Sequence, residues 1–245
     1  INFNSIPAFK NLNASSLNLI ENEATYINYK IGQEICKINI IPEQIIIILS
    51  GKARLLHIEP KNSKTLTKLG SDSFVGLSSL LRGEGCEQVN ASEEVIALSL
   101  SDKVILSLYQ EDLNFRDWCN TNIQMSEIYS IGRKIKANLP KCKFDIKEIT
   151  QILSENAILR TIKNHENYEP KDKYVSLTSS ANILEKNIGD EINSQDLIKT
   201  RGPLPARLIL INRDIYTQLI KESIPEIEDS NTISNNSDLS QLKII

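Results

Sequence analysis

Short segments rich in β-branched and aromatic residues follow one another through the first hundred residues of the chain. Turn formers such as Gly32, Pro42 and Gly51 separate them, and no helical period lies between them. Strands at even spacing without intervening helices are typical of an antiparallel roll or barrel. The expected strands are residues 24–29, 33–38, 44–50, 52–58, 65–69 and 93–100.

Helical spacing flanks this run of strands. Asn13 can cap a short amphipathic helix, and Ser101 with Asp102 can cap another. Between residues 121 and 139, apolar side chains recur every three or four positions, so we expect a long amphipathic helix that Pro140 ends.

The rest of the chain predicts a second, smaller unit. Asp145 and Glu148 have capping-box spacing at the start of a helix. Residues 165–173 have the composition of a linker, and strands are expected at 174–180 and 205–212. The expected fold class is therefore α+β: an antiparallel β-roll with flanking helices and a long connecting helix, then a small α+β domain. The expected boundaries are 1–140 for the roll and long helix, 141–222 for the small linking domain and 223–245 for a polar tail or linker.

Composition limits the kinds of partner. Lys and Arg number 28 against 31 Asp and Glu, a net charge of −3, so no overall field favours nucleic acid or anionic lipid. No apolar run approaches the roughly 18 to 20 residues that span a bilayer, and we expect a cytoplasmic protein without membrane insertion. The chain opens with Ile1 and not Met, so we expect further residues to precede it.

Candidate chemistry is sparse. We expect reduced thiols, no metal and no cofactor, because the cysteines lie far apart and only His57 and His165 accompany them. No phosphate-binding loop surrounds the pair Gly51 and Lys52, and no pair of nucleophile and base can be assembled, so an enzyme is not expected. The cysteines are Cys36, Cys86, Cys119 and Cys142.

The order of elements resembles the cyclic nucleotide-binding domain family over residues 8–135. The resemblance rests on the strand pattern and on five turn positions, where a tight barrel needs positive φ angles or close approach of the backbone. It implies a β-roll with a ligand pocket around residues 74–91. The five turn positions are Gly32, Pro42, Gly51, Gly70 and Gly76.

The same resemblance implies a degenerate pocket. In the family, a loop carboxylate binds the ribose hydroxyl and an arginine pairs with the cyclic phosphate. Here Leu77 stands at the carboxylate position, and Gly85 followed by Cys86 stands at the arginine position. We expect Arg82, on the near side of the Gly-x-Gly turn, to point to solvent, and Glu87 to repel a phosphate if it points inward. No cyclic nucleotide is therefore expected to bind in the candidate pocket, which comprises Gly76, Leu77, Ser78, Arg82, Gly85 and Cys86.

A second resemblance concerns context. The phrases LGSDSFVGLSSLLRGEGCEQVNASEEVIALSL, VSLTSSAN and GPLPARLI look like the N-terminal cytosolic region of cyanobacterial peptide-exporting ABC transporters of the bacteriocin type. This implies a non-enzymatic regulatory or interaction module on the cytosolic face of the inner membrane. Its partners would be downstream transporter domains or another protein.

Two alternatives remain open. The helix over residues 121–139 could pack on the roll, pass a signal, or join two copies in a homodimer.

The segment IKEITQILSENAILRTIKN resembles a helix-turn-helix, as in transcription regulators of the catabolite-activator type. Against this, the segment offers few side chains for base edges, and residues 143–222 carry balanced acidic and basic charge, so nucleic acid is not the expected partner.

Overall fold

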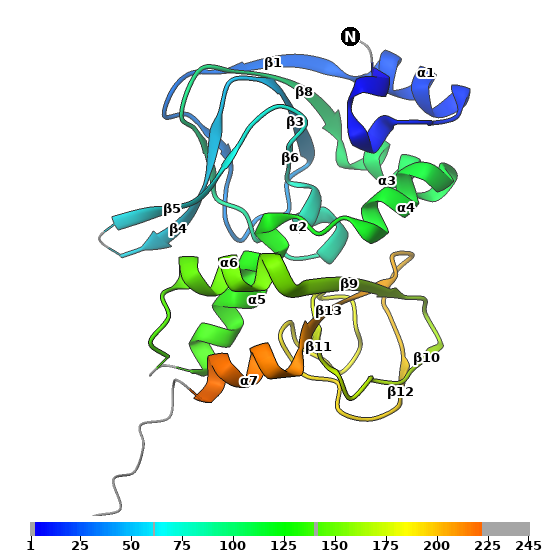
Figure 1. The fold of residues 1–245 in the computed structure, drawn as a ribbon. Helices are drawn as coiled ribbons and strands as arrows, with labels where there is room; N and C mark the ends of the chain where they lie inside the picture. The colour runs from blue at the N-terminus through cyan, green and yellow to red at the C-terminus, as the bar shows by residue number, and fades with distance from the viewer. Residues whose placement is uncertain (1–2, 61, 140–141, 222–245) are drawn as a thin grey trace, which may run out of the picture.

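Two antiparallel sheets of four strands form the expected β-roll (Figure 1). The computed structural model describes residues 3–60, 62–139 and 142–221. The sheet orders are β1-β8-β3-β6 and β2-β7-β4-β5, and side chains from both sheets share one apolar core. The strands are β1 (Thr25–Tyr29), β2 (Glu34–Cys36), β3 (Gln44–Ser50), β4 (Ala53–Glu59), β5 (Asn62–Leu69), β6 (Phe74–Val75), β7 (Val89–Ala91) and β8 (Val95–Ser101).

Strand β3 is buried on both faces, which explains its uninterrupted run of isoleucines. Ile46 and Ile48 face the interior of the roll, whereas Ile45 and Ile47 face the helices outside it. Side chains on a strand point alternately to the two faces, so a strand covered on both sides has no position for a polar residue. The β3 sequence therefore places it in the middle of the molecule.

Helices cover the outer face of β3 and β8. Their apolar residues, including Phe9, Ile20, Ile105 and Phe115, share a second core with Ile45 and Ile47. The predicted caps are confirmed, because the side chains of Asn13 and Ser101 accept from backbone N–H groups in the first turns of their helices. The elements are η1 (Phe3–Ser5), η2 (Pro7–Phe9), α1 (Ala14–Glu23), α2 (Leu77–Arg82), α3 (Asp102–Glu111) and α4 (Leu113–Thr121).

The long helix is shorter than predicted. It was expected to begin at Thr121, but α4 ends there and α5 runs over Met125–Asn138. Asn122 takes an extended conformation, and its side-chain amide donates to the Trp118 carbonyl, which ends α4. Both flanking helices are amphipathic, so the apolar period continues across the break between them. The period alone therefore does not reveal where α4 ends and α5 begins.

Helix α5 lies between the roll and the rest of the chain. Tyr129 packs in the roll core, whereas Ile128, Ile131 and Ile135 pack in a core with the second unit. The expected boundary at residue 140 stays a prediction, and the apolar face of α5 is buried within the chain.

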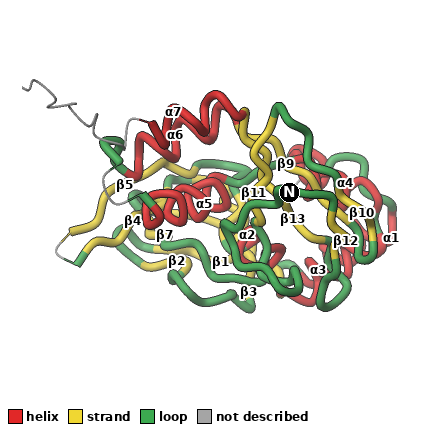
Figure 2. Tube along the Cα trace, turned by 90° about the horizontal axis from the view of Figure 1, so that it is seen from below, coloured by secondary structure: helices red, strands yellow, loops and turns green. Residues whose placement is uncertain are grey.

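The second unit combines two small sheets with helices α6 and α7, with sheet orders β11-β13-β9 and β10-β12. Seen from below, helices α5, α6 and α7 gather toward one end of the molecule, and strands β10 and β12 of this unit lie toward the other (Figure 2). The predicted capping box of Asp145 and Glu148 is confirmed at the start of α6. The elements are α6 (Ile146–Asn156), β9 (Ala157–Ile162), β10 (Glu166–Tyr168), β11 (Tyr174–Thr178), β12 (Asp196–Ile198), β13 (Ala206–Asn212) and α7 (Arg213–Lys221).

One alternative and one expectation for this unit are wrong. The helix-turn-helix alternative places the segment AILRTI in a second helix, but this segment is strand β9 and pairs with β13 along its whole length. The predicted linker over residues 165–173 contains β10, which pairs with β12 and buries Tyr168. Tertiary pairing decides both segments, because each is too short for its local pattern to settle the structure. The predicted tail over residues 223–245 lies outside the described residues.

Over the described ranges, no helix is long and apolar enough to cross a bilayer. The same residues contain no cluster of His, Cys, Asp and Glu that could hold a metal ion.

Candidate functional site

The candidate pocket is a short loop and helix between strands β6 and β7. Gly76 begins α2 with a left-handed φ of 93°, and a Cβ there would come closer than 3.0 Å to the Pro42 ring. A glycine is needed at this turn both for the backbone angle and for the space. The turn aims the N-terminal N–H groups of α2 at the side chain of Glu87.

Glu87 fills the position in front of these N–H groups. Its Oε2 accepts from Gly76 N at 2.8 Å, and its Oε1 accepts from Ser79 N at 3.2 Å and from the Ser79 hydroxyl at 3.3 Å. The side chain is 1% exposed. Burial raises the pKa of the Glu87 carboxyl, against the opposing effect of the N–H donors. Glu87 therefore does point inward, which is the case in which we expect it to repel a phosphate, and its carboxyl lies in front of the N–H groups at the start of α2.

Gly85 cannot carry the arginine that the family uses. An added Cβ would lie closer than 3.0 Å to the backbone of Asn39 and Ile40. Any side chain at this position would require the backbone of one of the two segments to move. The cation is therefore absent from the sequence, and the packing leaves no room for it.

The other candidate residues are buried in the packing of this region. Leu77 is 1% exposed and belongs to the core beneath the outer helices. The Ser78 hydroxyl accepts from Ser126 of α5 at 2.9 Å, and the Cys86 N–H donates to the Ser79 hydroxyl at 3.1 Å. That no cyclic nucleotide binds at these six residues stays a prediction.

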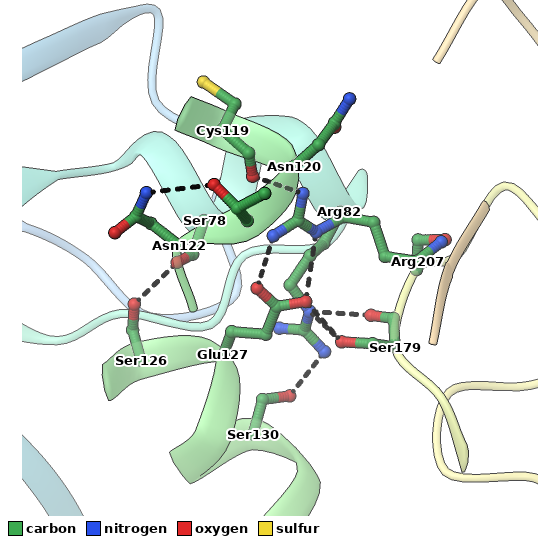
Figure 3. Close-up of polar contacts among 12 residues, drawn as sticks. Ser78, Arg82, Cys119, Asn120, Asn122, Ser126, Glu127, Ser130, Ser179 and Arg207 are labelled. Carbon is green, nitrogen blue, oxygen red and sulfur yellow. Dashed lines mark hydrogen bonds and ion pairs between the residues drawn. The ribbon is translucent and has the colours of Figure 1, made fainter. Parts of the chain in front are cut away.

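The prediction that Arg82 points to solvent is wrong. Its side chain is fully buried and reaches across to the second unit (Figure 3). Its Nε donates to the Ser179 carbonyl at 2.6 Å and to the Ser179 hydroxyl at 3.2 Å, while Nη2 donates to the Ser130 hydroxyl at 2.9 Å. Turn statistics place an arginine here in water, but the second unit covers the turn and supplies acceptors instead.

A buried ion pair adjoins Arg82. Arg207 of β13 binds Glu127 of α5 with two hydrogen bonds, Nη2 to Oε2 at 2.7 Å and Nε to Oε1 at 3.0 Å. Arg207 Nη1 also donates to the Cys119 carbonyl at 3.1 Å, and the Ser179 hydroxyl donates to Glu127 at 2.8 Å. Both charged side chains are almost fully buried.

Each charged side chain of this pair favours the ionised form of the other. Burial acts to raise the pKa of Glu127, but the Arg207 guanidinium and its hydrogen bonds hold that pKa below its usual value. Sequence reasoning missed both residues. The only signal was an arginine inside an otherwise apolar strand, PARLILIN, because such a residue needs a buried partner.

The thiols and the histidine on the roll show no activated chemistry. Burial raises the pKa of Cys86 to about 11 and that of Cys119 to about 12, so neither is a thiolate near neutral pH. Burial lowers the pKa of His57, whose Nδ1 lies 2.6 Å from the Tyr129 hydroxyl. The two thiols are packed in the interior, whereas the His57 side chain is half-buried.

Comparison with known proteins agrees with this geometry for the first half of the chain. Residues 26–112 match the family model of the cyclic nucleotide-binding domain. These residues have the β-roll fold of a cyclic nucleotide-binding domain. The expected fold class is confirmed with it. The match covers the strands from β1 to β8 and helices α2 and α3. Gly76, Ser79 and Glu87, which we call the Glu87 cassette, therefore lie inside the matched residues, and Arg207 lies outside them.

Several solved structures are similar to this chain at low sequence identity. The regulatory domain of Toxoplasma gondii PKA with cAMP is 9% identical, with 90% of each chain covered and a TM-score of 0.41. A cyclic nucleotide-binding-like protein from Brucella abortus is 17% identical over 44% of this chain and 94% of that one, with a TM-score of 0.39. The sensor domain of the transcriptional regulator DNR from Pseudomonas aeruginosa is 13% identical over 46% and 82%, with a TM-score of 0.42. No curated protein sequence matches the chain.

Proposed function

We propose that this chain is a non-enzymatic regulatory or interaction module. Its Glu87 carboxyl fills the Glu87 cassette and so closes it to a cyclic nucleotide. The observation that carries the proposal is the set of hydrogen bonds from Gly76 and Ser79 to the Glu87 carboxyl. In this reading the cassette is a structural element that joins the roll to the second unit, and regulation acts through protein contacts.

The energetics favour the closed cassette. A cyclic phosphate would have to displace the Glu87 carboxyl from its donors in Gly76 and Ser79, and a typical hydrogen bond contributes roughly 0.5–1.5 kcal/mol net. It would then lie in a buried site without a cation to pair with, since Gly85 has no side chain and Arg82 is committed to Ser179 and Ser130. Each of these effects opposes binding.

We further propose that the module belongs to the N-terminal region of a peptide-exporting ABC transporter. The three phrases that carry this resemblance contain Arg82, Ser179 and Arg207 in turn. These residues meet in the buried network around Glu127 (Figure 3). Segments far apart in the sequence therefore build one structural feature, which supports treating the resemblance as a single unit. The partners would be the downstream transporter domains or another protein.

Isothermal titration with cyclic AMP and cyclic GMP tests the closed cassette. We expect no binding tighter than about 10 μM for the native chain. Glu87→Gln should not restore binding, because Gly85 still excludes a cation. A known cyclic AMP-binding domain serves as the positive control. Tight binding to the native chain would refute the proposal.

The transporter context has its own tests. We expect the gene to encode a cysteine peptidase, six membrane spans and a phosphate-binding loop after residue 245. A stop codon there would refute this part. A gel-shift experiment covers the transcription-regulator alternative, since tight, salt-sensitive DNA binding would favour that class.

A further inference from the structure

A cleft of about 600 Å³ opens where α3 and α4 meet the second unit. Its lining comes from α3, α4, β9 and β10, and Figure 1 shows β9 running below α4. Tyr109, Arg116 and Asn120 line it from the roll side. The other side is lined by residues 203–205 and by residues of β9, β10 and the loop between them: Arg160, Thr161, Lys163, Asn164 and Glu166. The cleft is separate from the Glu87 cassette.

The cleft is cationic. Its lining has three basic side chains, Arg116, Arg160 and Lys163, and one acidic side chain, Glu166. The Arg160–Glu166 pair is 3.8 Å long, and the arginine is 57% exposed, so this pair is weak. Among the described residues, the Lys163 amine has no hydrogen-bond or ion-pair partner. The lining therefore offers spare positive charge.

Two hydrogen bonds hold the Arg116 side chain in position at the cleft. Its Nε donates to the Tyr109 carbonyl at 2.8 Å, and its Nη2 donates to the Gln110 carbonyl. These bonds fix the guanidinium at the end of α3 and leave Nη1 for other acceptors. A positioned guanidinium loses less side-chain entropy on binding an anion than a mobile one does.

The rest of the lining is apolar or neutral. Pro203, Leu204 and Pro205 form one wall, and the Tyr109 hydroxyl donates to Asn120 at 2.8 Å on the other. Small-molecule sites in proteins run from roughly 300 to 1,000 Å³ and combine apolar walls with a few polar groups. Size and lining both match a small molecule.

We propose that this cleft binds a small organic anion that carries a carboxylate, sulfonate or phosphate group on an apolar or ring portion. The acidic group lies with Lys163, Arg160 and Arg116, and the apolar part lies on the Leu204 wall. The proposal goes beyond the proposed function, because it gives the module a ligand that is not held in the cyclic nucleotide cassette.

Such a ligand would act on the joint between the two halves. Asn120 follows Cys119, whose carbonyl accepts from Arg207, and Pro205 lies two residues before Arg207. The ligand therefore contacts both sides of the seam next to the buried ion pair. Because it binds the assembled seam and not the separated halves, it raises the thermal midpoint of the chain.

The test uses a matched pair of fluorescent probes on the whole chain. 8-Anilinonaphthalene-1-sulfonate supplies rings and an acidic group, and N-phenyl-1-naphthylamine has the same rings without the charge. Energy transfer from Trp118, the only tryptophan, reports that the probe lies near α4. The test variant is Arg160→Gln with Lys163→Gln. The control variant, Arg54→Gln with Lys68→Gln, removes the same charge from the exposed β4–β5 pair.

We expect one bound sulfonate probe per chain, with energy transfer from Trp118, and about tenfold weaker binding to the test variant. The control variant should bind within about twofold of the native chain, and the neutral probe about tenfold more weakly than the sulfonate. Absence of sulfonate binding, equal binding of the two probes, or equal loss in the test and control variants would each overturn the proposal.

Discussion

Removing Arg207 should destabilise the whole chain far more than removing any surface cation. In Arg207→Met, the Glu127 carboxylate keeps the Ser179 hydroxyl but loses both hydrogen bonds from the guanidinium. Its side chain is 0% exposed, so water cannot replace them. Breaking a buried pair by removing one partner costs about 3–5 kcal/mol.

For a chain of this size, about 2–4 °C of thermal midpoint corresponds to 1 kcal/mol, so the expected loss is roughly 6–20 °C. The double variant Glu127→Met with Arg207→Met removes both charges and should recover most of this loss. The control is Lys52→Met, since the Lys52–Glu93 pair is about half exposed at 3.5 Å and should contribute less than about 1 kcal/mol.

Scanning calorimetry and urea titration of the native chain, Arg207→Met, Glu127→Met, the double variant and Lys52→Met measure these differences. The coupling energy between Glu127 and Arg207 should reach at least about 2 kcal/mol in the double-mutant cycle. If Arg207→Met lies within about 1 kcal/mol of the native chain, or if the two single losses add in the double variant, the pair is not the buried joint described here.

Three further predictions concern the loop and the helix cap. Gly85→Ala should cost roughly 2–4 kcal/mol in urea titration because its Cβ meets the Ile40 backbone, while Gly70→Ala, in open space, should stay within about 0.5 kcal/mol; equal costs would contradict the close approach. Burial raises the pKa of Glu87, so the fold favours the neutral carboxyl. The free energy of unfolding of the native chain should therefore fall relative to that of Glu87→Gln as pH rises from about 4 through the raised pKa. A rise over this range would show that the fold favours the ionised carboxylate. The hydrogen bond from the Glu148 N–H lowers the pKa of Asp145, so Asp145→Ala should cost about 1 kcal/mol of unfolding free energy near neutral pH. This difference from the native chain should disappear below about pH 4. A difference that does not change with pH would exclude a cap that depends on the Asp145 charge.

The β-roll could be predicted because its strands are coded locally. Runs such as Ile45 to Ile48 leave few alternatives to a buried strand, and the caps at Asn13, Ser101 and Asp145 each contain donor and acceptor within four residues. Strand β9 could not be predicted in the same way. Its residues continue the apolar pattern of α6, and only pairing with β13, some fifty residues later, makes it a strand.

The candidate site was predictable in composition but not in geometry. The absence of a carboxylate at Leu77 and of a cation at Gly85 is visible in the sequence, but the partners of Glu87 are backbone N–H groups that every sequence contains. The destination of Arg82 depends on Ser179, ninety-seven residues away in the chain. Such contacts exist only once the second unit has packed on the roll.

The double role of helix α5 bears on how this chain can be divided for laboratory work. A fragment ending near residue 140 would keep Tyr129 in its place but would open Ile128, Ile131 and Ile135 to water, together with the Glu127 charge. A fragment ending at Thr121 would instead expose the part of the roll core that Tyr129 covers. Either cut exposes an apolar surface that favours aggregation, and a fragment intended for crystallisation or labelling should run uninterrupted from η1, whose neighbour Phe9 belongs to the outer core, to α7.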